Sequence, residues 1–326
     1  DGGVEVRAVA LLLLLVLELA VFASVSGADV STVSGIVGYL ELKFLDLIPG
    51  LAPVLVLSVG MTLVLVTAGI DLSVGSMLAL VAAVMSLFDG GTTFWFTAVP
   101  LGLLVGVGLG LFNGALVARL DVPPIVATLG TMIFYRGLCQ LVMRDAERAP
   151  FFDVPGYEWL GGFSGALVTV GLVAGVGGWF WGRSRWRREL LLVGGNRVAA
   201  RYAGVPVDRR LMETYAVMGV LAWVAATCFT ARNGAVNAST ATGLELKVIV
   251  AVVLGGTRVE GGRGSLVGSV LGALLVAVLD DGLREAKGWS DEHLPFEISH
   301  FRYLLLGLLL VVGVWLNTRI GRREEG

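Results

Sequence analysis

The apolar residues of this sequence run in long, nearly uninterrupted blocks, such as 8–25 and 301–316. About 20 apolar residues in a row are what an α-helix needs to cross a bilayer. Only 15% of the chain is charged and 56% is hydrophobic, whereas a soluble domain carries about 25% charged residues. A transmembrane barrel would instead show alternating segments of about ten residues. The pattern predicts an all-α polytopic membrane protein, with one transmembrane domain over residues 1–326.

The apolar blocks predict about ten transmembrane helices. Block 246–256 is too short to cross the membrane alone, so either the count is lower or that span is broken. The first block is long for a signal peptide and lacks a clear small-residue cleavage site, which favours a retained first helix. The expected spans are 4–26, 47–68, 72–88, 94–118, 124–143, 166–181, 211–231, 246–256, 265–283 and 300–317.

Arginines predict the orientation of these spans, because cytoplasmic loops are enriched in Lys and Arg. Segment 182–210 holds eight arginines and is expected in the cytoplasm, and the C-terminal tail is also rich in arginine. Segments 144–165 and 284–299 lean acidic and are expected outside. Ten spans with both the N- and the C-terminus in the cytoplasm satisfy all of these assignments.

Glycines recur at four-residue spacing within several spans. Lipid provides no hydrophobic drive between helices, so small residues that let backbones approach are typical of helix contacts. We therefore expect helix-packing faces at three sets of glycines, which are Gly102, Gly106, Gly110 and Gly114; Gly268 and Gly272; and Gly171 and Gly175.

The glycine-rich stretch 255–275 resembles 65–80, since both pass through a Val-Gly-Ser sequence. The likeness suggests two half-repeats in which both stretches turn at the cytoplasmic side. Segment 256–265 also has the glycine content of a phosphate-binding loop. It lacks the Lys-Ser/Thr pair that reaches the phosphates and magnesium, so we expect no nucleotide to bind there.

Residues suited to catalysis or metal binding are scarce. The only histidines, His293 and His300, lie in or beside an expected external segment, without metal-site spacing to cysteines or carboxylates. Cys139 and Cys228 lie inside apolar runs, which disfavours a disulfide framework. We expect no catalytic residue, metal, cofactor or nucleic-acid partner on this chain, and no enzymatic activity.

Five polar residues placed against apolar runs are the candidates for a solute pathway: Asp71, Ser73, Asn113, Thr128 and Glu245. Ionisable and hydrogen-bonding groups near the membrane mark solute routes, and neutral hydroxyls and amides suit an uncharged polar solute. The same residues also suit structural roles, since carboxylates cap helix starts and hydroxyls bond neighbouring helices. The sequence leaves both interpretations open.

A short helix is predicted inside the basic segment, between Gly195 and the stop signals Gly204 and Pro206. It is too short and too polar to span. It suits either the anionic headgroups of the membrane or the groove of a soluble partner. The candidate docking residues are Gly195, Asn196, Arg197, Ala199, Ala200, Arg201, Gly204 and Val205.

Four motifs occur in order along the chain: AGIDLSVGSMLAL, NGALVARLDVPPIVATLGTM, GGNRVAARYAGVPVDR and GLELKVIVAVVLGGTRVEGGRGSLVGSVLGALL. Together they resemble the permease subunits of bacterial ribose-type ABC sugar importers, and the similarity extends from Leu55 to Leu310. The resemblance implies a multi-pass permease of the inner membrane that moves a monosaccharide-like solute.

The resemblance also implies partners. These are a second permease copy or a paralogue, cytoplasmic ABC ATPase subunits that carry the ATP, and an extracytoplasmic solute-binding protein. Segment 182–210 would be the cytoplasmic coupling segment that transmits ATPase motion. Lys247 and segment 287–300 depart from the family pattern on the solute-receiving side, which leaves the sugar open.

The alternative is a stand-alone secondary carrier or channel. That class needs coupling-ion sites at mid-membrane, and Glu18 is the only carboxylate that the sequence places clearly inside a span.

Overall fold

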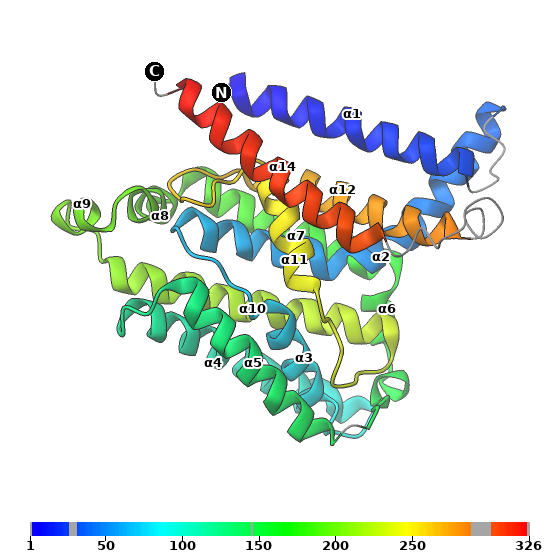
Figure 1. Cartoon of the computed structure of the whole chain (residues 1–326). Coiled ribbons are helices and arrows are strands. Elements are labelled where there is room, and N and C mark those ends of the chain that lie inside the picture. The colour runs from blue at the N-terminus through cyan, green and yellow to red at the C-terminus, as the bar shows by residue number, and fades with distance from the viewer. Residues whose placement is uncertain (1, 26–30, 145, 288–300, 325–326) are drawn as a thin grey trace.

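The computed structural model describes residues 2–25, 31–144, 146–287 and 301–324. Their regular structure is helical, apart from an isolated antiparallel pairing of Arg148 with Val236. The helices form one bundle (Figure 1). In chain order they are α1 (Gly2–Val25), α2 (Val33–Val66), α3 (Val74–Met85), η1 (Thr92–Phe96), α4 (Ala98–Ala118), α5 (Pro124–Met143), η2 (Pro150–Asp153), α6 (Glu158–Gly161), α7 (Phe163–Arg183), α8 (Arg185–Gly195), α9 (Arg197–Tyr202), α10 (Val207–Asn233), α11 (Leu244–Leu254), α12 (Leu266–Glu285) and α14 (Phe301–Glu324).

Each of the ten expected spans has a helix in the structure, and the prediction of an all-α polytopic membrane protein is confirmed. Six described helical segments are long and apolar enough to cross a membrane: α2, η1 with α4, α5, α7, α10 and α12. The count of ten spans therefore stays a prediction. Residue 300 of the last expected span and most of the acidic segment 284–299 lie outside the described residues.

Two of the helices are only half the length of a span. α3 has 12 residues and α11 has 11. At 1.5 Å per residue each is roughly 17–18 Å long, against a hydrocarbon core of about 30 Å. The expectation of a full span at 72–88 is therefore wrong, because the chain stays non-helical through Ser73 and the helix ends at Met85. The short span expected at 246–256 is confirmed as α11.

The two half-helices begin side by side and run apart. Gly75 in the first turn of α3 lies against Ala241 and Glu245 at the start of α11. Beyond the end of α3, Gly90 lies against η2. Beyond the end of α11, the Gly262 N–H donates to the carbonyl of Val66 at the end of α2. α3 therefore points to one end of the bundle and α11 to the other.

This arrangement corrects the expected repeat. α3 and α11 each follow a long helix and a non-helical connection, 67–73 or 234–243, and each precedes a loop and another long helix. The structural counterpart of 67–73 is thus 234–243, and 255–265 corresponds to 86–97. The halves run in opposite directions, as in inverted-repeat transporters. The likeness between 65–80 and 255–275 rests on too few residues to reveal this.

Close glycine contacts hold α4 to α10. A Cβ on Gly106 would overlap the carbonyl of Gly219, and one on Gly110 would overlap that of Tyr215. Gly268 and Gly272 approach α11 in the same way. These two packing faces are confirmed. The third has no partner among the described residues, since a Cβ on Gly171 or Gly175 would meet nothing within 4 Å, and it stays a prediction.

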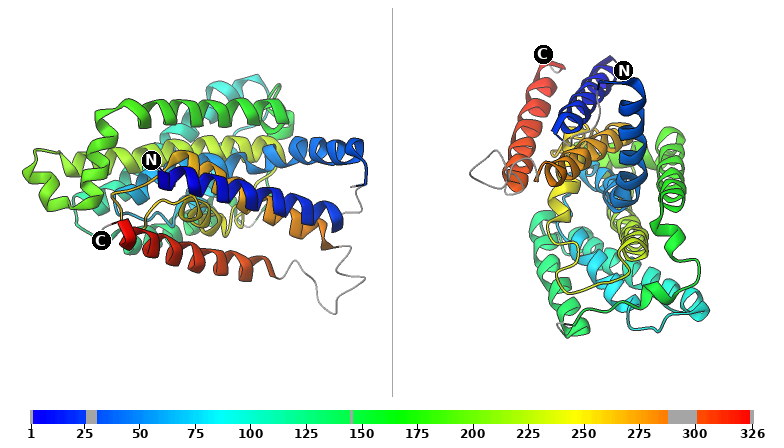
Figure 2. Two further views of the ribbon diagram at one scale, coloured as in Figure 1. Left: turned by 90° about the horizontal axis from the view of Figure 1, so that it is seen from above. Right: turned by 90° about the vertical axis from the view of Figure 1, so that its right-hand side faces the viewer.

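Both chain ends lie at the end of the bundle that carries α8 and α9, and α6 lies at the opposite end (Figure 1). A view from above shows the same placement (Figure 2). We call these the α9 end and the α6 end. The buried interior centres on α3, of whose 12 residues all but Val84 are buried. α7 turns most of its surface outward, with exposed side chains such as Leu172 and Val176.

Candidate functional site

A buried polar network lies where the chain enters α3. Asp71 Oδ1 accepts hydrogen bonds from Ser73 N at 2.9 Å and from Ser73 Oγ at 2.6 Å. From α4, Asn113 Nδ2 donates to Ser73 Oγ at 2.8 Å and to Asp71 Oδ2 at 3.4 Å. All three side chains are fully buried. Asp71 therefore holds the turn before α3 through Ser73, while among the described residues no side chain caps the first amides of α3 itself.

Two residues of α5 extend this network. Tyr135 Oη lies 3.1 Å from Asn113 Oδ1 and donates to Leu109 O at 2.9 Å. Thr128 Oγ1 donates to Ile70 O at 3.0 Å, in the connection before α3. The network therefore ties α4 and α5 to the entry of the half-helix.

Glu245 lies beside the network without joining it. Its Oε1 accepts from the Gly243 N–H at 3.2 Å, and its Oε2 lies against Gly75. Arg136 on α5 donates to Ala238 O at 2.9 Å and to Thr240 O at 2.7 Å, which fixes the connection 234–243. The structure thus brings the predicted pathway residues to the meeting point of the half-helices. That they touch solute stays a prediction.

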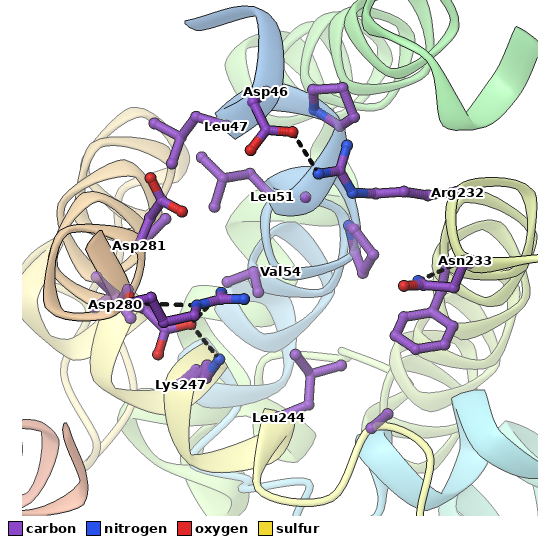
Figure 3. Close-up of a pocket in the computed structure, with 18 of the residues that line it drawn as sticks. Asp46, Leu47, Leu51, Val54, Arg232, Asn233, Leu244, Lys247, Asp280 and Asp281 are labelled. Carbon is purple, nitrogen blue, oxygen red and sulfur yellow. Dashed lines mark hydrogen bonds and ion pairs between the residues drawn. The ribbon is translucent and has the colours of Figure 1, made fainter. Parts of the chain in front are cut away.

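The α6 end of the bundle contains a cavity of about 330 Å³. It lies between α2, α10, α11 and α12 and reaches Ala241, Leu244 and Lys247, where α11 begins. Pro49 and Pro53, which interrupt the hydrogen-bond ladder of α2, line one wall. We refer to this space as the α6-end cavity (Figure 3).

Ion pairs surround the α6-end cavity. On one side Arg232 donates to Asp46 at 2.8 Å (Figure 3). On another side Asp280 Oδ2 accepts from Lys247 at 2.8 Å and from Arg284 at 2.9 Å. Asp281 also lines the cavity and pairs with Lys43 of α2 at 2.6 Å.

Sequence reasoning missed the charged lining of this cavity. It noticed Lys247 only as a departure from a family pattern. The two carboxylates Asp280 and Asp281 fall in the last turns of an apolar span, as Lys247 falls near the start of another. Charges inside apolar runs are costly unless they face protein or water. The presence of opposite charges in two apolar spans was therefore the signal that could have revealed this lining.

The predicted coupling segment forms two helices at the α9 end. Asn196 caps α9 by accepting from the N–H groups of Val198 and Ala199 at 2.9 and 3.0 Å. Val198 and Tyr202, four residues apart, are 60% and 90% exposed. Ala200 and Val205 are buried and anchor the segment, so these two candidate docking residues face the protein.

Ion pairs bind α8 to the start of α10. Glu189 of α8 accepts from Arg185 and from Arg210, and Arg210 also pairs with Glu213 at 2.6 Å. The hydrogen bond from Arg210, and then that from Arg185, lowers the pKa of Glu189 below its usual value. Trp186 donates from its indole to Glu213 at 2.9 Å.

The end of α8 touches the connection before α3 and the loop after α11. Gly194 lies against the carbonyl of Val66, just before the connection to α3. The same carbonyl accepts from Gly262 N at 2.9 Å, in the loop that follows α11. Gly261 lies against Ala68 and Gly194 and has a φ of +88°, which favours glycine. We call this contact of three segments the α8 junction.

Comparison with known proteins bears on this architecture. The family model described as "Branched-chain amino acid transport system / permease component" matches residues 44–314, most of the chain. The chain belongs to this family of permease components. It is therefore a multi-pass inner-membrane protein and not an enzyme.

Among its relatives are permeases of three import systems. The chain is 35% identical to the ribose import permease protein of Escherichia coli, over 70% of this chain and 73% of the relative. It is 35% identical to an autoinducer 2 import system permease protein of Klebsiella pneumoniae, over 84% and 82%. It is 31% identical to the fructose import permease protein of Bifidobacterium longum, over 87% and 83%. No solved structure matches the chain.

Proposed function

We propose that this permease moves a monosaccharide-like solute across the inner membrane, driven by ATP hydrolysis on a separate subunit. The main observation in support of the proposal is the extent of the α6-end cavity. It leads from one end of the bundle to the start of α11, where the two half-helices meet. Discontinuous helices that meet inside the membrane are where transporters hold their solutes.

The α9 end is the cytoplasmic side in this proposal. The arginine-rich α8 and α9 lie there, as the positive-inside rule requires, and so do both chain ends. The α6 end then faces the extracytoplasmic solute-binding protein. A second permease copy or a paralogue would complete the membrane part.

The coupling segment 182–210 would receive the motion of the ATPase subunits. The exposed Val198 and Tyr202 offer an apolar ridge at the tip of α9, of the kind that docks into a partner's groove. α8 carries the displacement to the α8 junction, where it reaches the connection before α3 and the loop after α11. One movement thereby acts on α3 and α11 together. The two half-helices would separate at the point where the predicted pathway residues lie, which are Asp71, Ser73, Asn113, Thr128 and Glu245.

Reconstitution tests the proposal against a stand-alone carrier. The permease is placed in proteoliposomes with its ATPase subunits, with the binding protein outside and ATP inside, and uptake of radiolabelled ribose and fructose is measured. We expect uptake that needs both ATP and the binding protein. Uptake by the permease alone, driven by a proton or sodium gradient without ATP, would overturn the proposal.

A further inference from the structure

We propose that the α6-end cavity holds the solute itself, that it selects an uncharged polyhydroxylated molecule, and that the Lys247–Asp280 pair sets this specificity. The inference rests on the proposed function and adds to it the site, the chemistry of the ligand and the residues that discriminate.

The charges of the lining balance one another. Three carboxylates and three cations line the cavity, and each is already joined to an opposite charge. The pairs are Asp46 with Arg232, Asp280 with Lys247 and Arg284, and Asp281 with Lys43. An anion would be repelled by the carboxylate of each pair, and a cation by its lysine or arginine. The cavity therefore favours neither charge.

A hydroxyl group can use the same pairs without breaking them. Ammonium and guanidinium groups each carry several donors, and an ionised carboxylate has several acceptor positions. A sugar hydroxyl both donates and accepts, so it can bridge the two partners of one pair with charge-assisted hydrogen bonds. Asn233 and Thr242 add neutral polar groups to the lining.

Burial identifies the pair that discriminates. The Lys247 and Asp280 side chains are only 15% and 6% exposed, whereas those of Asp46 and Arg284 are 74% and 66% exposed. Water therefore competes for Asp46 and Arg284 but is largely excluded from the Lys247–Asp280 pair. Hydrogen bonds to a desolvated pair discriminate most between solutes that have a hydroxyl and solutes that lack one.

Shape and apolar surface agree with this chemistry. About 330 Å³ is near the lower limit of small-molecule pockets, which start at about 300 Å³, so the cavity suits one small molecule. Phe229, Pro53 and Val54 give apolar wall for the C–H faces of a sugar ring. A branched-chain amino acid would also fill this volume, but its two charges would each compete with an existing ion pair.

The test uses the reconstituted complex and the double variant Lys247→Met/Asp280→Leu. Replacing both partners leaves no lone buried charge between them, so the variant is expected to fold. The readouts are initial uptake of ribose, fructose and leucine, the ATPase rate with the binding protein, and the unfolding midpoint. Thr62→Val/Ser269→Ala is the matched control, because it removes a buried polar pair that joins two helices at 2.7 Å but lies outside the cavity lining.

We expect the double variant to lose sugar uptake by about tenfold or more, while its ATPase rate stays within about twofold of wild type. The Thr62→Val/Ser269→Ala complex should keep its uptake. Unchanged sugar uptake in the double variant would overturn the inference, because the pair would then be structural. So would a wild-type complex that imports leucine with ATP in preference to sugars. If the wild type shows no ATP-dependent uptake, the proposed function itself fails.

Discussion

At the scale of single residues, the buried polar network at the start of α3 contributes to the stability of the fold, whether or not it contacts solute. Asp71, Ser73 and Asn113 have no exposed surface. A buried polar group costs free energy unless it is hydrogen-bonded, and these three satisfy one another. The network therefore fixes the non-helical entry to α3 in one geometry.

Two buried tyrosines give a matched test of this network. Tyr135 Oη donates to Leu109 O and contacts Asn113, whereas Tyr215 Oη lies against Gly69 and has no hydrogen-bond partner among the described residues. We expect Tyr135→Phe to lower the free energy of unfolding by about 1 kcal/mol, the net value of a lost hydrogen bond. Tyr215→Phe should leave it unchanged or raise it.

Thermal unfolding of the purified protein in detergent measures both variants. If Tyr215→Phe destabilises the protein as much as Tyr135→Phe does, the hydroxyl of Tyr215 must also be hydrogen-bonded, which would contradict the structure.

Glu189 gives a prediction about pH. Bonds from Arg210 and Arg185 lower its pKa below the ordinary 4.5. A lowered pKa in the folded state contributes stability above the ordinary value, and this contribution is lost as the pH falls through the lowered one. We expect Glu189→Gln to lower the unfolding midpoint near neutral pH, and the gap from wild type to close below about pH 4.5. A gap that is equally wide at acid pH would contradict the role of the carboxylate charge.

At the scale of elements, close backbone approach decides which helices pair. α4 offers a test within one helix, because Gly110 lies against α10 whereas a Cβ on Gly108 would meet nothing within 4 Å. We expect Gly110→Val to separate the helices and destabilise the protein by about 1–3 kcal/mol, as overpacking does. Gly108→Ala should stabilise by about 0.5–1 kcal/mol, since alanine favours helix over glycine. Equal effects in the unfolding midpoint would refute the packing of α4 on α10.

The sequence predicts the helices well, since apolar length alone marks where each one lies. Segment 124–143 coincides with α5, from Pro124 to Met143. Apolar length predicts the wrong bounds for α3, because the apolar run 72–88 is nearly as long as a span. Only the tertiary structure shows that the chain stays non-helical through Ser73, where Asp71 accepts a hydrogen bond from the backbone N–H of Ser73. Glycine spacing likewise predicts a small-residue face but not which helix packs on it. In the part of the chain that the structure describes, no residue packs on Gly171 or Gly175.

The candidate site is less accessible from sequence than the helices. Asp71, Ser73 and Asn113 could be singled out because each is polar beside an apolar run, and the structure joins them. The charged lining of the α6-end cavity comes from four separate helices, and each charge alone resembles a helix end at the membrane surface. Their pairing depends on the bundle, which the sequence does not specify residue by residue.

At the scale of the whole molecule, α9 and α6 lie at opposite ends of the bundle (Figure 1), and the α6-end cavity lies away from α9. This separation allows the two functions to be tested independently. We expect Tyr202→Ala to reduce co-purification of the ATPase subunits while the permease stays folded, because Tyr202 is 90% exposed. Trp159→Ala is the control, an aromatic on α6 that is 50% exposed at the other end.

Loss of the ATPase subunits in both variants, or in neither, would show that α9 is not the docking element. Pull-down from detergent-solubilised membranes, followed by densitometry of the two subunits, gives the comparison.

The burial of α3 has a consequence for how the chain is made. α3 leaves the ribosome early, yet its surroundings include α10, which is synthesised more than a hundred residues later. α3 is also too short to settle across the bilayer as an independent span. Until α10 is synthesised, the nascent N-terminal half must therefore stay in the membrane with α3 incompletely packed. A chain that stops before Val207 is one that membrane quality-control proteases should recognise and remove.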